Sequence, residues 1–344
     1  MQFVLGIFAA MIITNNASLK EYNTFGMDVK ADAVVEWASE LELKAVLPEL
    51  ERPILAIGQG SNLLFMDDFH GTVLKSAVQG IDILDITSDY VTVRVGSGIP
   101  WDDFVTYCVL KGWWGVENLA AIPGQVGAAA VQNIGAYGAQ ADQVIDTVIA
   151  VSLQDGSVWE FTCEECRYAY RQSIFKNELK GQYAISHVIF TLGLKPSPKL
   201  GYGNLEHEVS LLGEASPINI SKAVRSIRQS KLPDPQVLGN AGSFFMNPTV
   251  TRAQYDGLTE RYPDMPSYST PNPDMVKIPA GWLIEKAGWK GRSMGKAAVH
   301  DRQALVLVNL GGATGQDIMA LAKAVTESVE DMFSITLSME VNCI

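Results

Sequence analysis

The chain has 344 residues, of which 47% are hydrophobic and 19% charged, and its formal net charge is −12. This length predicts two or three domains, and the composition is that of a globular protein with enough apolar material for its cores. The acidic balance argues against nucleic acid or an anionic membrane surface as the main partner, although local basic clusters remain able to bind an anionic small molecule.

Residues 1–13, MQFVLGIFAAMII, form an apolar stretch that is too short to span a bilayer and lacks the basic start of a secretory signal. We interpret residues 1–10 as a non-native extension, with Met11 as the natural start. Cleavage near Ala10 would instead indicate export. The remaining sequence contains no other segment that is long and apolar enough for a transmembrane helix.

The first half of the chain alternates strand and helix signals. Residues 39–50 have helical periodicity with acids in the first turn, whereas residues 66–76 lack an amphipathic helical pattern. Residues 52–65 are predicted to form a strand, a glycine loop and a second strand. Residues 90–112 read as a strand, a glycine turn and a helix opened by Pro100.

The second half continues the mixture. Residues 144–162 are typical of a hairpin around the turn Asp155-Gly156, and residues 183–194 of a strand. A helical pattern begins near Ser216, and the chain ends with a predicted helix over 315–333 and a short strand over 334–341. Strands and helices are mixed without regular βαβ alternation, so the predicted class is α+β, with a plausible boundary at residues 232–235, Leu-Pro-Asp-Pro.

Four cysteines are too few for a disulfide framework in a chain of this size. Cys163 and Cys166 form a single C-x-x-C motif, but no second pair accompanies it and the chain has only four histidines. We therefore expect no metal site, and we expect reduced thiols in a cytoplasmic protein.

A glycine loop after an apolar strand is the first candidate binding site. In GQGSNLLF, Gly58 and Gly60 let backbone N–H groups approach an anion, and Ser61 and Asn62 add polar side chains. The loop is not a Rossmann fingerprint, because a second strand follows it instead of a helix. A plain tight turn is the alternative.

A second run of small residues, IPGQVGAAAVQNIGAYG, covers residues 122–138, and all of its polar side chains are neutral. Backbone this bare usually lies against something flat and large, although close packing of a helix or strand is the alternative. Two such runs in one acidic protein favour a bound dinucleotide.

An ordered set of motifs now resembles one family over roughly residues 22–341. The motifs are YNTFG, GQGSNLLF, ENLAAIPGQVGAA, QNIGAYG, CRYAYRQSIFK, KLPDP, NAGSFFMNP, AGWLIE and AAVHDRQALVLVN. The chain is similar to the UDP-N-acetylenolpyruvoylglucosamine reductases, flavoenzymes of bacterial peptidoglycan synthesis, in the branch with an inserted tyrosine loop. The resemblance implies an FAD-binding fold of the vanillyl-alcohol-oxidase (PCMH) type in two subdomains, residues 1–79 and 80–218, with a substrate-binding domain at 219–344.

The resemblance also implies non-covalent FAD, NADPH as co-substrate, UDP-N-acetylglucosamine enolpyruvate as substrate, and a monomer. The residues implied in FAD binding are Gly58, Gly60, Ser61, Asn62, Ile122, Gly124, Gly127, Gln132, Asn133 and Gly135.

Three residues match the family's catalytic positions. Ser243 matches the proton donor, with an ordinary turn serine as the alternative. Arg171 matches the arginine that faces the enolate, with a structural ion pair as the alternative. Glu340 matches a group that polarises the substrate carboxylate, with an exposed acid on a terminal strand as the alternative.

Two segments without any acid, residues 215–233 and 286–300, supply local positive charge that suits phosphate-bearing reactants. The residues implied in substrate binding are Tyr137, Tyr202, Arg228, Lys231, Asn247 and Lys277. The chain departs from the family pattern at Asn342, where relatives often have arginine, and at Ala128 and Ala129, where some have serine. We expect these changes to alter affinity and to leave the function intact.

Two other functions compete with this reading. One is a flavin oxidase of the same fold that acts on an alcohol or sugar and holds its flavin covalently through a histidine or cysteine; the only histidine near the glycine loop is His70. The other is a non-enzymatic nucleotide-binding protein, against which the joint presence of Arg171, Ser243 and Glu340 argues.

Overall fold

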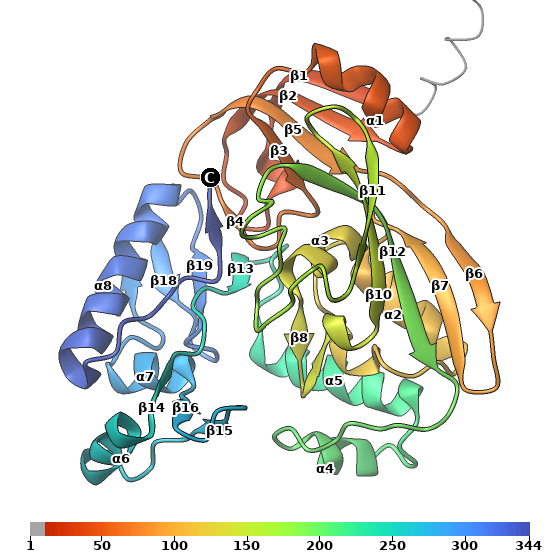
Figure 1. Ribbon diagram of the computed structural model, residues 1–344. Helices are drawn as coiled ribbons and strands as arrows, with labels where there is room; N and C mark the ends of the chain where they lie inside the picture. The colour runs from red at the N-terminus through yellow and green to blue at the C-terminus, as the bar shows by residue number, and fades with distance from the viewer. Residues whose placement is uncertain (1–10) are drawn as a thin grey trace, which may run out of the picture. The chain divides into compact units, whose positions relative to one another are not determined.

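A computed structural model describes residues 11–344 (Figure 1). The interpretation of residues 1–10 as a non-native extension lies outside these residues. The chain folds into two compact units, each assembled from separate segments: unit 1 contains residues 11–17, 31–59 and 69–230, and unit 2 contains 18–30, 60–68 and 231–344. Among the described residues, no helix combines the length and the apolar character needed to cross a bilayer.

The first sheet of unit 1 has four strands in the order β1-β2-β5-β3. Its strands are β1 (Ile12–Ser18), β2 (Lys30–Trp37), β3 (Ile54–Ile57) and β5 (Phe69–Ser76). The central strand β5 pairs in parallel with both β2 and β3. Helix α1 (Glu40–Val46) begins after Ser39, whose side chain accepts a hydrogen bond from the Glu42 N–H.

The second sheet of unit 1 is antiparallel, with the order β11-β10-β12-β7-β6. Its strands are β6 (Ile81–Ile86), β7 (Tyr90–Gly96), β10 (Ile145–Ser152), β11 (Val158–Thr162) and β12 (Tyr183–Gly193). Helices α2 (Trp101–Leu110) and α3 (Val126–Gln132) accompany this sheet, and α3 packs on β7 and β12 (Figure 1). The fully buried rings of Trp101, Phe104 and Phe190 meet in its core.

Three further pieces complete unit 1. Strands β8 (Gly135–Ala136) and β9 (Ala139–Gln140) form a small hairpin, and α4 (Leu205–Ser210) precedes the longer α5 (Pro217–Lys231). Helix α5 buries Ile220, Ala223, Val224 and Ile227. This is the spacing of one helix face, and Arg225 and Arg228 lie at positions outside this set.

Unit 2 contains a four-stranded sheet in the order β13-β19-β18-β17 and a three-stranded sheet in the order β14-β16-β15. Its elements are β4 (Leu63–Leu64), β13 (Gly239–Ser243), β14 (Thr249–Thr251), α6 (Arg252–Arg261), β15 (Tyr268–Ser269), β16 (Met275–Lys277), α7 (Ala280–Lys286), β17 (Ser293–Met294), β18 (Ala297–Val299), β19 (Val306–Asn309), α8 (Gly315–Phe333) and β20 (Asn342–Cys343). Helix α8 lies beside β18 and β19 (Figure 1). β4 pairs in parallel with β20, so two segments far apart in sequence meet at one edge.

The structure confirms the α+β class, the hairpin of β10 and β11, and the helix over 315–333. The predicted strand over 334–341 is wrong. This segment is extended but makes a single bridge, between Met339 and Phe245, and the terminal strand begins at Asn342. The alternation of apolar residues that predicted a strand reflects burial of Ile335, Leu337 and Val341 instead.

Candidate active site

Arg171 lies on a two-residue turn of unit 1. Ala169 and Gln172 exchange two backbone hydrogen bonds of 3.2 and 3.0 Å, so Tyr170 and Arg171 form the turn between them. Arg171 has φ +58°, in the left-handed region where glycine is the unstrained choice. Non-glycine residues held in such conformations cluster at functional sites.

The Arg171 guanidinium is directed to two carbonyl groups that follow α3. Nη2 donates to the Gly135 oxygen at 2.6 Å, and Nη1 donates to the Asn133 oxygen at 3.4 Å. A Cβ on Gly135 would lie 3.0 Å from Nη1. Glycine at 135 therefore permits the close approach of the arginine.

Asn133 is fully buried at the C-terminal end of α3, with φ +44°. Its Oδ1 accepts from the Asp142 N–H at 3.0 Å, and its Nδ2 donates to Asp142 Oδ2 at 3.1 Å and to the Ala169 oxygen at 3.0 Å. The whole amide is therefore bonded inside unit 1.

Tyr137 and Tyr202 face each other in unit 1, with ring centroids 5.8 Å apart and planes at 78°. Asn118, which is buried, donates to the carbonyl oxygens of Tyr137 and Lys199, each at 2.8 Å. One amide thus ties the QNIGAYG segment to the loop that carries Tyr202. Burial raises the pKa of Tyr137, so its hydroxyl stays protonated at neutral pH.

Arg228 extends from α5 and donates from Nε to the Ala121 oxygen at 3.1 Å. Burial lowers its pKa, and Arg171 acts in the same direction, against Tyr137 and Asp102. Ala121 itself has φ +57°, and its N–H donates to Asp102 Oδ1 at 2.6 Å. The guanidinium groups of Arg171 and Arg228 therefore affect each other electrostatically, and that of Arg228 is largely buried. Such a pair of cations suits an anionic ligand.

Gly58 packs closely against Ala128 and Gln125 in unit 1. A Cβ on Gly58 would lie 3.0 Å from Ala128 Cβ and 3.4 Å from Gln125 Oε1. Gln125 Nε2 donates to the carbonyls of Ser76 and Gly98, but its Oε1 is buried without a hydrogen-bond partner among residues 11–344. Such an oxygen costs about 1–3 kcal/mol unless a ligand supplies a donor.

The other residues of unit 1 that are expected to bind the cofactor are held by hydrogen bonds and by packing. The Gly124 N–H is bonded to Gln59 Oε1 at 3.0 Å, and a Cβ on Gly127 would lie 2.8 Å from Ser97 Cβ. Ile122 packs on the core of unit 1, and Gln132, the last residue of α3, is half-buried.

The glycine loop passes from unit 1 to unit 2 between residues 59 and 60. Gly60 has φ +67° and lies so close to the Tyr22 oxygen that an added Cβ would be 2.0 Å away. Ser61 follows it, half-buried. Asn62 Nδ2 donates to the Glu340 oxygen at 3.1 Å, so this loop also holds the C-terminal segment.

Ser243 and Glu340 lie on two antiparallel segments of unit 2. The Met246 N–H donates to the Ser338 carbonyl oxygen, and the Glu340 N–H donates to the Phe244 carbonyl oxygen at 2.9 Å. Between them, Phe245 and Met339 form an antiparallel β-bridge. Phe244 and Phe245 are fully buried, whereas Ser243 is half-buried. Part of the serine is therefore accessible to a ligand.

The remaining predicted substrate contacts of unit 2 lie around β14 and β16. Lys277 is paired with Thr249, and the Ile278 N–H donates to the Pro248 carbonyl oxygen, so Asn247, just before β14, lies near the end of β16 that carries Lys277. Asn247 Oδ1 accepts from the Ala280 N–H at 2.9 Å and so caps α7. Lys231, at the end of α5, is exposed.

Three residues that position this site were not predicted from the sequence: Asp102, Asn118 and Gln125. Asn118 and Gln125 are polar residues within largely apolar segments, and this is the signal that could have identified them. Asp102 lies in the first turn of α2, where it forms an ion pair with Arg225 in addition to its bond with Ala121.

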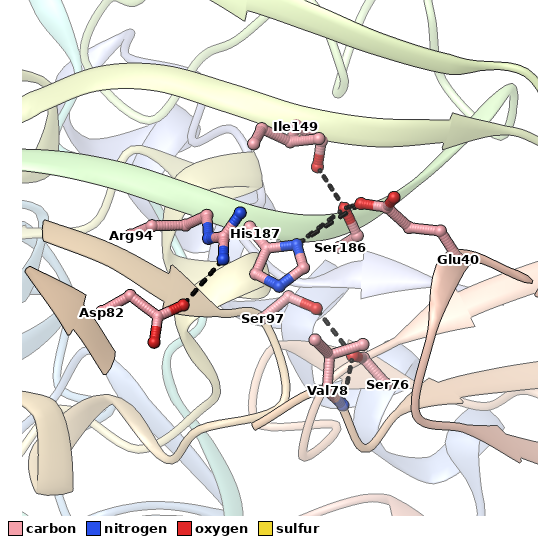
Figure 2. A network of polar contacts seen from close by, with 9 residues as sticks. All are labelled: Glu40, Ser76, Val78, Asp82, Arg94, Ser97, Ile149, Ser186 and His187. Carbon is pink, nitrogen blue, oxygen red and sulfur yellow. Dashed lines mark hydrogen bonds and ion pairs between the residues drawn. The ribbon is translucent and has the colours of Figure 1, made fainter. Parts of the chain in front are cut away.

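A second cluster has the side-chain types of a catalytic triad but not its geometry (Figure 2). His187 Nδ1 lies 3.2 Å from Ser186 Oγ and 3.4 Å from Glu40 Oε1, so both partners face the same ring nitrogen. A triad needs the serine and the acid on opposite nitrogens. Ser186 is also fully buried, and its Oγ lies 2.6 Å from Glu40 Oε1, so the cluster ties α1 to β12.

All four cysteines are unpaired. Burial raises the pKa of Cys166 to about 12, so this thiol stays protonated and unreactive at neutral pH. His70 lies on β5 with its side chain 86% exposed, beside Asp32.

Comparison with known proteins settles the family. A UDP-N-acetylenolpyruvoylglucosamine reductase of Bacteroides fragilis is 47% identical over 329 residues, which cover 95% of this chain and 98% of the relative. The chain belongs to the UDP-N-acetylenolpyruvoylglucosamine reductase family. A reductase of the same name from Porphyromonas gingivalis is 45% identical over 342 residues, covering 97% of this chain and 100% of that protein.

Domain profiles and a solved structure agree with this membership. The FAD binding domain profile matches residues 31–162, and the C-terminal domain profile of UDP-N-acetylenolpyruvoylglucosamine reductase matches residues 234–344. The crystal structure of the Thermus caldophilus UDP-N-acetylenolpyruvylglucosamine reductase (MurB) has a TM-score of 0.69 at 24% identity, over 97% of this chain and 99% of that one. The predicted family, the fold and the FAD-binding domain are confirmed.

Proposed function

We propose that this reductase-family protein converts UDP-N-acetylglucosamine enolpyruvate into UDP-N-acetylmuramate, with NADPH as the electron source and non-covalent FAD as the cofactor. The observation that carries the proposal is the relationship to named reductases along nearly the whole chain. The product is a precursor of peptidoglycan, so the reaction would serve cell-wall synthesis, cell shape and division. Both reactants are cytoplasmic nucleotides, which supports a cytoplasmic site of action, and we propose that the protein acts as a monomer.

The residues of unit 1 fit FAD. The Gly58 backbone lies so close to Ala128 that an added Cβ would be 3.0 Å from Ala128 Cβ, and the unpartnered Gln125 Oε1 beside them is a buried acceptor. The polar edge of a flavin carries an N–H donor that would satisfy this oxygen. The predicted contacts from Ser61, Asn62, Ile122, Gly124, Gly127, Gln132 and Gly135 remain part of the proposal.

Bound FAD would supply the hydride-transfer chemistry that links NADPH to the methylene carbon of the enolpyruvyl group. The carbon next to the substrate carboxylate then bears a charge that the protein must stabilise and protonate. We assign stabilisation to Arg171, whose guanidinium is fixed by the carbonyls of Asn133 and Gly135. Glu340 would act on the substrate carboxylate from the segment that is paired with Phe244.

Ser243 would donate the proton. A serine hydroxyl is a weak acid and transfers a proton only to a strongly basic carbon, which requires a site without competing water. Ser243 is half-buried and directly precedes the fully buried Phe244 and Phe245, an apolar flank that supports this role because it helps to exclude water.

Phosphate groups of the reactants would be bound by the cationic residues. Arg228 is held by the Ala121 carbonyl and is partly withdrawn from water, whereas Lys231 is exposed. Tyr137 and Tyr202 would pack on the sugar nucleotide, with Asn247 and Lys277 as further contacts. With Asn342 in place of the arginine of relatives, we expect weaker substrate binding and retained turnover.

Steady-state turnover tests the function. The purified protein should be yellow, release its flavin on acid precipitation, and oxidise NADPH only when the enolpyruvyl nucleotide is added. Flavin that stays attached after acid precipitation, together with oxygen-dependent oxidation of an alcohol or sugar, would favour the covalent flavin oxidase instead. The exposed position of His70 argues against such an attachment.

A further inference from the structure

The turn that carries Arg171 is fastened to the C-terminal end of α3. Ser173 Oγ donates to the Val131 oxygen at 2.5 Å, and Asn133 Nδ2 donates to the Ala169 oxygen at 3.0 Å. These bonds hold the chain on either side of Tyr170 and Arg171. The turn therefore takes its position from α3.

Asn133 contacts the turn in two ways. Its side-chain amide holds the Ala169 carbonyl, and its backbone carbonyl accepts from Arg171 Nη1 at 3.4 Å. The left-handed conformation of Asn133, φ +44°, sets the direction of that carbonyl, and asparagine tolerates this conformation better than most residues. One residue thus fixes both the backbone and the charged end of Arg171.

The Asn133 amide is also held from behind. Asp142 accepts from Nδ2 at 3.1 Å and donates its N–H to Oδ1 at 3.0 Å, and Asn133 is 0% exposed. A side chain bonded on both ends and closed off from solvent has no surface with which to contact a cofactor. Its role must be carried by what it orients inside the protein.

Arg171 needs such support because its backbone is strained. A non-glycine residue at φ +58° costs about 1 kcal/mol or more and relaxes unless its surroundings hold it. Misplacement of a charged group by about 1 Å can lower a rate about 100-fold.

We propose that Asn133 is a positioning residue for Arg171: it fixes the strained turn and the guanidinium so that the positive charge meets the developing enolate. This inference rests on the proposed function and deepens it. It also replaces the expectation that the Asn133 side chain binds the cofactor.

The experiment uses the complete FAD-loaded protein and measures the two half-reactions separately by stopped-flow absorbance. Asn133→Gly keeps the left-handed backbone and removes the amide. We expect flavin reduction by NADPH to stay within about twofold, while reoxidation by the enolpyruvyl nucleotide slows about 10- to 100-fold. Asn16→Gly is the matched control, because Asn16 has φ +48° but is exposed; it should change neither rate.

A double-mutant cycle with Arg171→Met provides the decisive readout. Once the guanidinium is gone, Asn133→Gly should slow reoxidation no further. Equal slowing by Asn133→Gly in both backgrounds, equal slowing of both half-reactions, or no slowing at all would overturn the inference. If Arg171→Met alone leaves reoxidation unchanged, the assignment of Arg171 in the proposed function fails first, and the inference fails with it.

Asn133→Asp covers the case in which the glycine variant does not fold. It keeps the size of the side chain and its tolerance of the left-handed region, but replaces the Nδ2 donor with an oxygen facing Asp142 and Ala169. It should reproduce the slowed reoxidation with normal FAD content. Loss of FAD binding in both variants would contradict the inference and return Asn133 to a role in folding or cofactor retention.

Discussion

The backbone N–H of Glu340 donates a 2.9 Å hydrogen bond to the carbonyl oxygen of Phe244, the residue after Ser243. The candidate acid and the candidate proton donor are therefore held by one pair of antiparallel segments. Asn62 reinforces the pair through the Glu340 carbonyl at 3.1 Å. Because neither of these bonds uses the Ser243 side chain, the serine hydroxyl can be removed without loosening the segments.

Replacement of Ser243 by alanine should separate the two half-reactions. We expect NADPH to reduce the flavin normally, while reoxidation by the enolpyruvyl nucleotide falls about 10²- to 10⁴-fold, the usual contribution of a positioned proton donor. Stopped-flow absorbance measures both steps. Ser293→Ala, an exposed serine on β17, serves as the control. Unchanged reoxidation in Ser243→Ala would remove the serine from the mechanism.

Replacement of Arg228 by methionine should weaken binding of the phosphate-bearing substrate. Loss of a charge-assisted contact of about 1.5–3 kcal/mol raises KM about 10- to 100-fold. The control is Lys222→Met, which removes an exposed cation from the same helix. Equal changes in KM for the two variants would mean that only the overall charge of α5 matters.

Replacement of Phe244 by alanine should destabilise unit 2. The ring is fully buried between Phe25 and Phe245, with centroids 6.4 and 5.2 Å away, so its removal should cost about 3–5 kcal/mol. Urea unfolding followed by tryptophan fluorescence measures the loss. Met339→Ala, on the paired segment but 42% exposed, should shift the midpoint far less. Similar shifts for both would show that Phe244 is not a core residue.

His187 should make stability sensitive to mild acid. Burial lowers its pKa in the folded protein, so the fold favours the neutral ring, although Glu40 opposes the shift. The unfolded chain, with a histidine pKa near 6.5, takes up the proton first. The stability contribution is thus fully present above pH 6.5 and is lost as the pH falls through the lower folded value.

His187→Gln should therefore flatten the fall in the urea midpoint between pH 7 and 5. His300, which burial also shifts downward, supplies the comparison, since His300→Gln should flatten it independently. A wild-type midpoint that stays constant over this range would contradict both assignments.

Local patterns predicted the parts of the fold that depend on local chemistry. The helix over 315–333 was readable because its apolar stripe is continuous and Thr314 caps its start. The hairpin of β10 and β11 was readable from Asp155-Gly156 and the alternation on either side.

Long-range pairing was not readable from local patterns. Apolar and polar residues alternate over 334–341 as they do in a strand, but the terminal strand is the following element, β20. Its partners are Leu63 and Leu64, which are remote in the sequence. The sequence around Asn62 does not predict that its side-chain amide donates to the backbone carbonyl of Glu340. The same holds for Asn133, whose motif suggested a cofactor contact and whose amide is bonded inside the protein.

A single-turnover experiment without oxygen tests the central claim most directly. The FAD-loaded protein is reduced with one equivalent of NADPH and mixed with UDP-N-acetylglucosamine enolpyruvate. We predict that the absorbance of oxidised flavin returns and that one equivalent of UDP-N-acetylmuramate forms. Flavin that stays reduced with the enolpyruvyl nucleotide and reoxidises only when oxygen is admitted would contradict the proposed reaction.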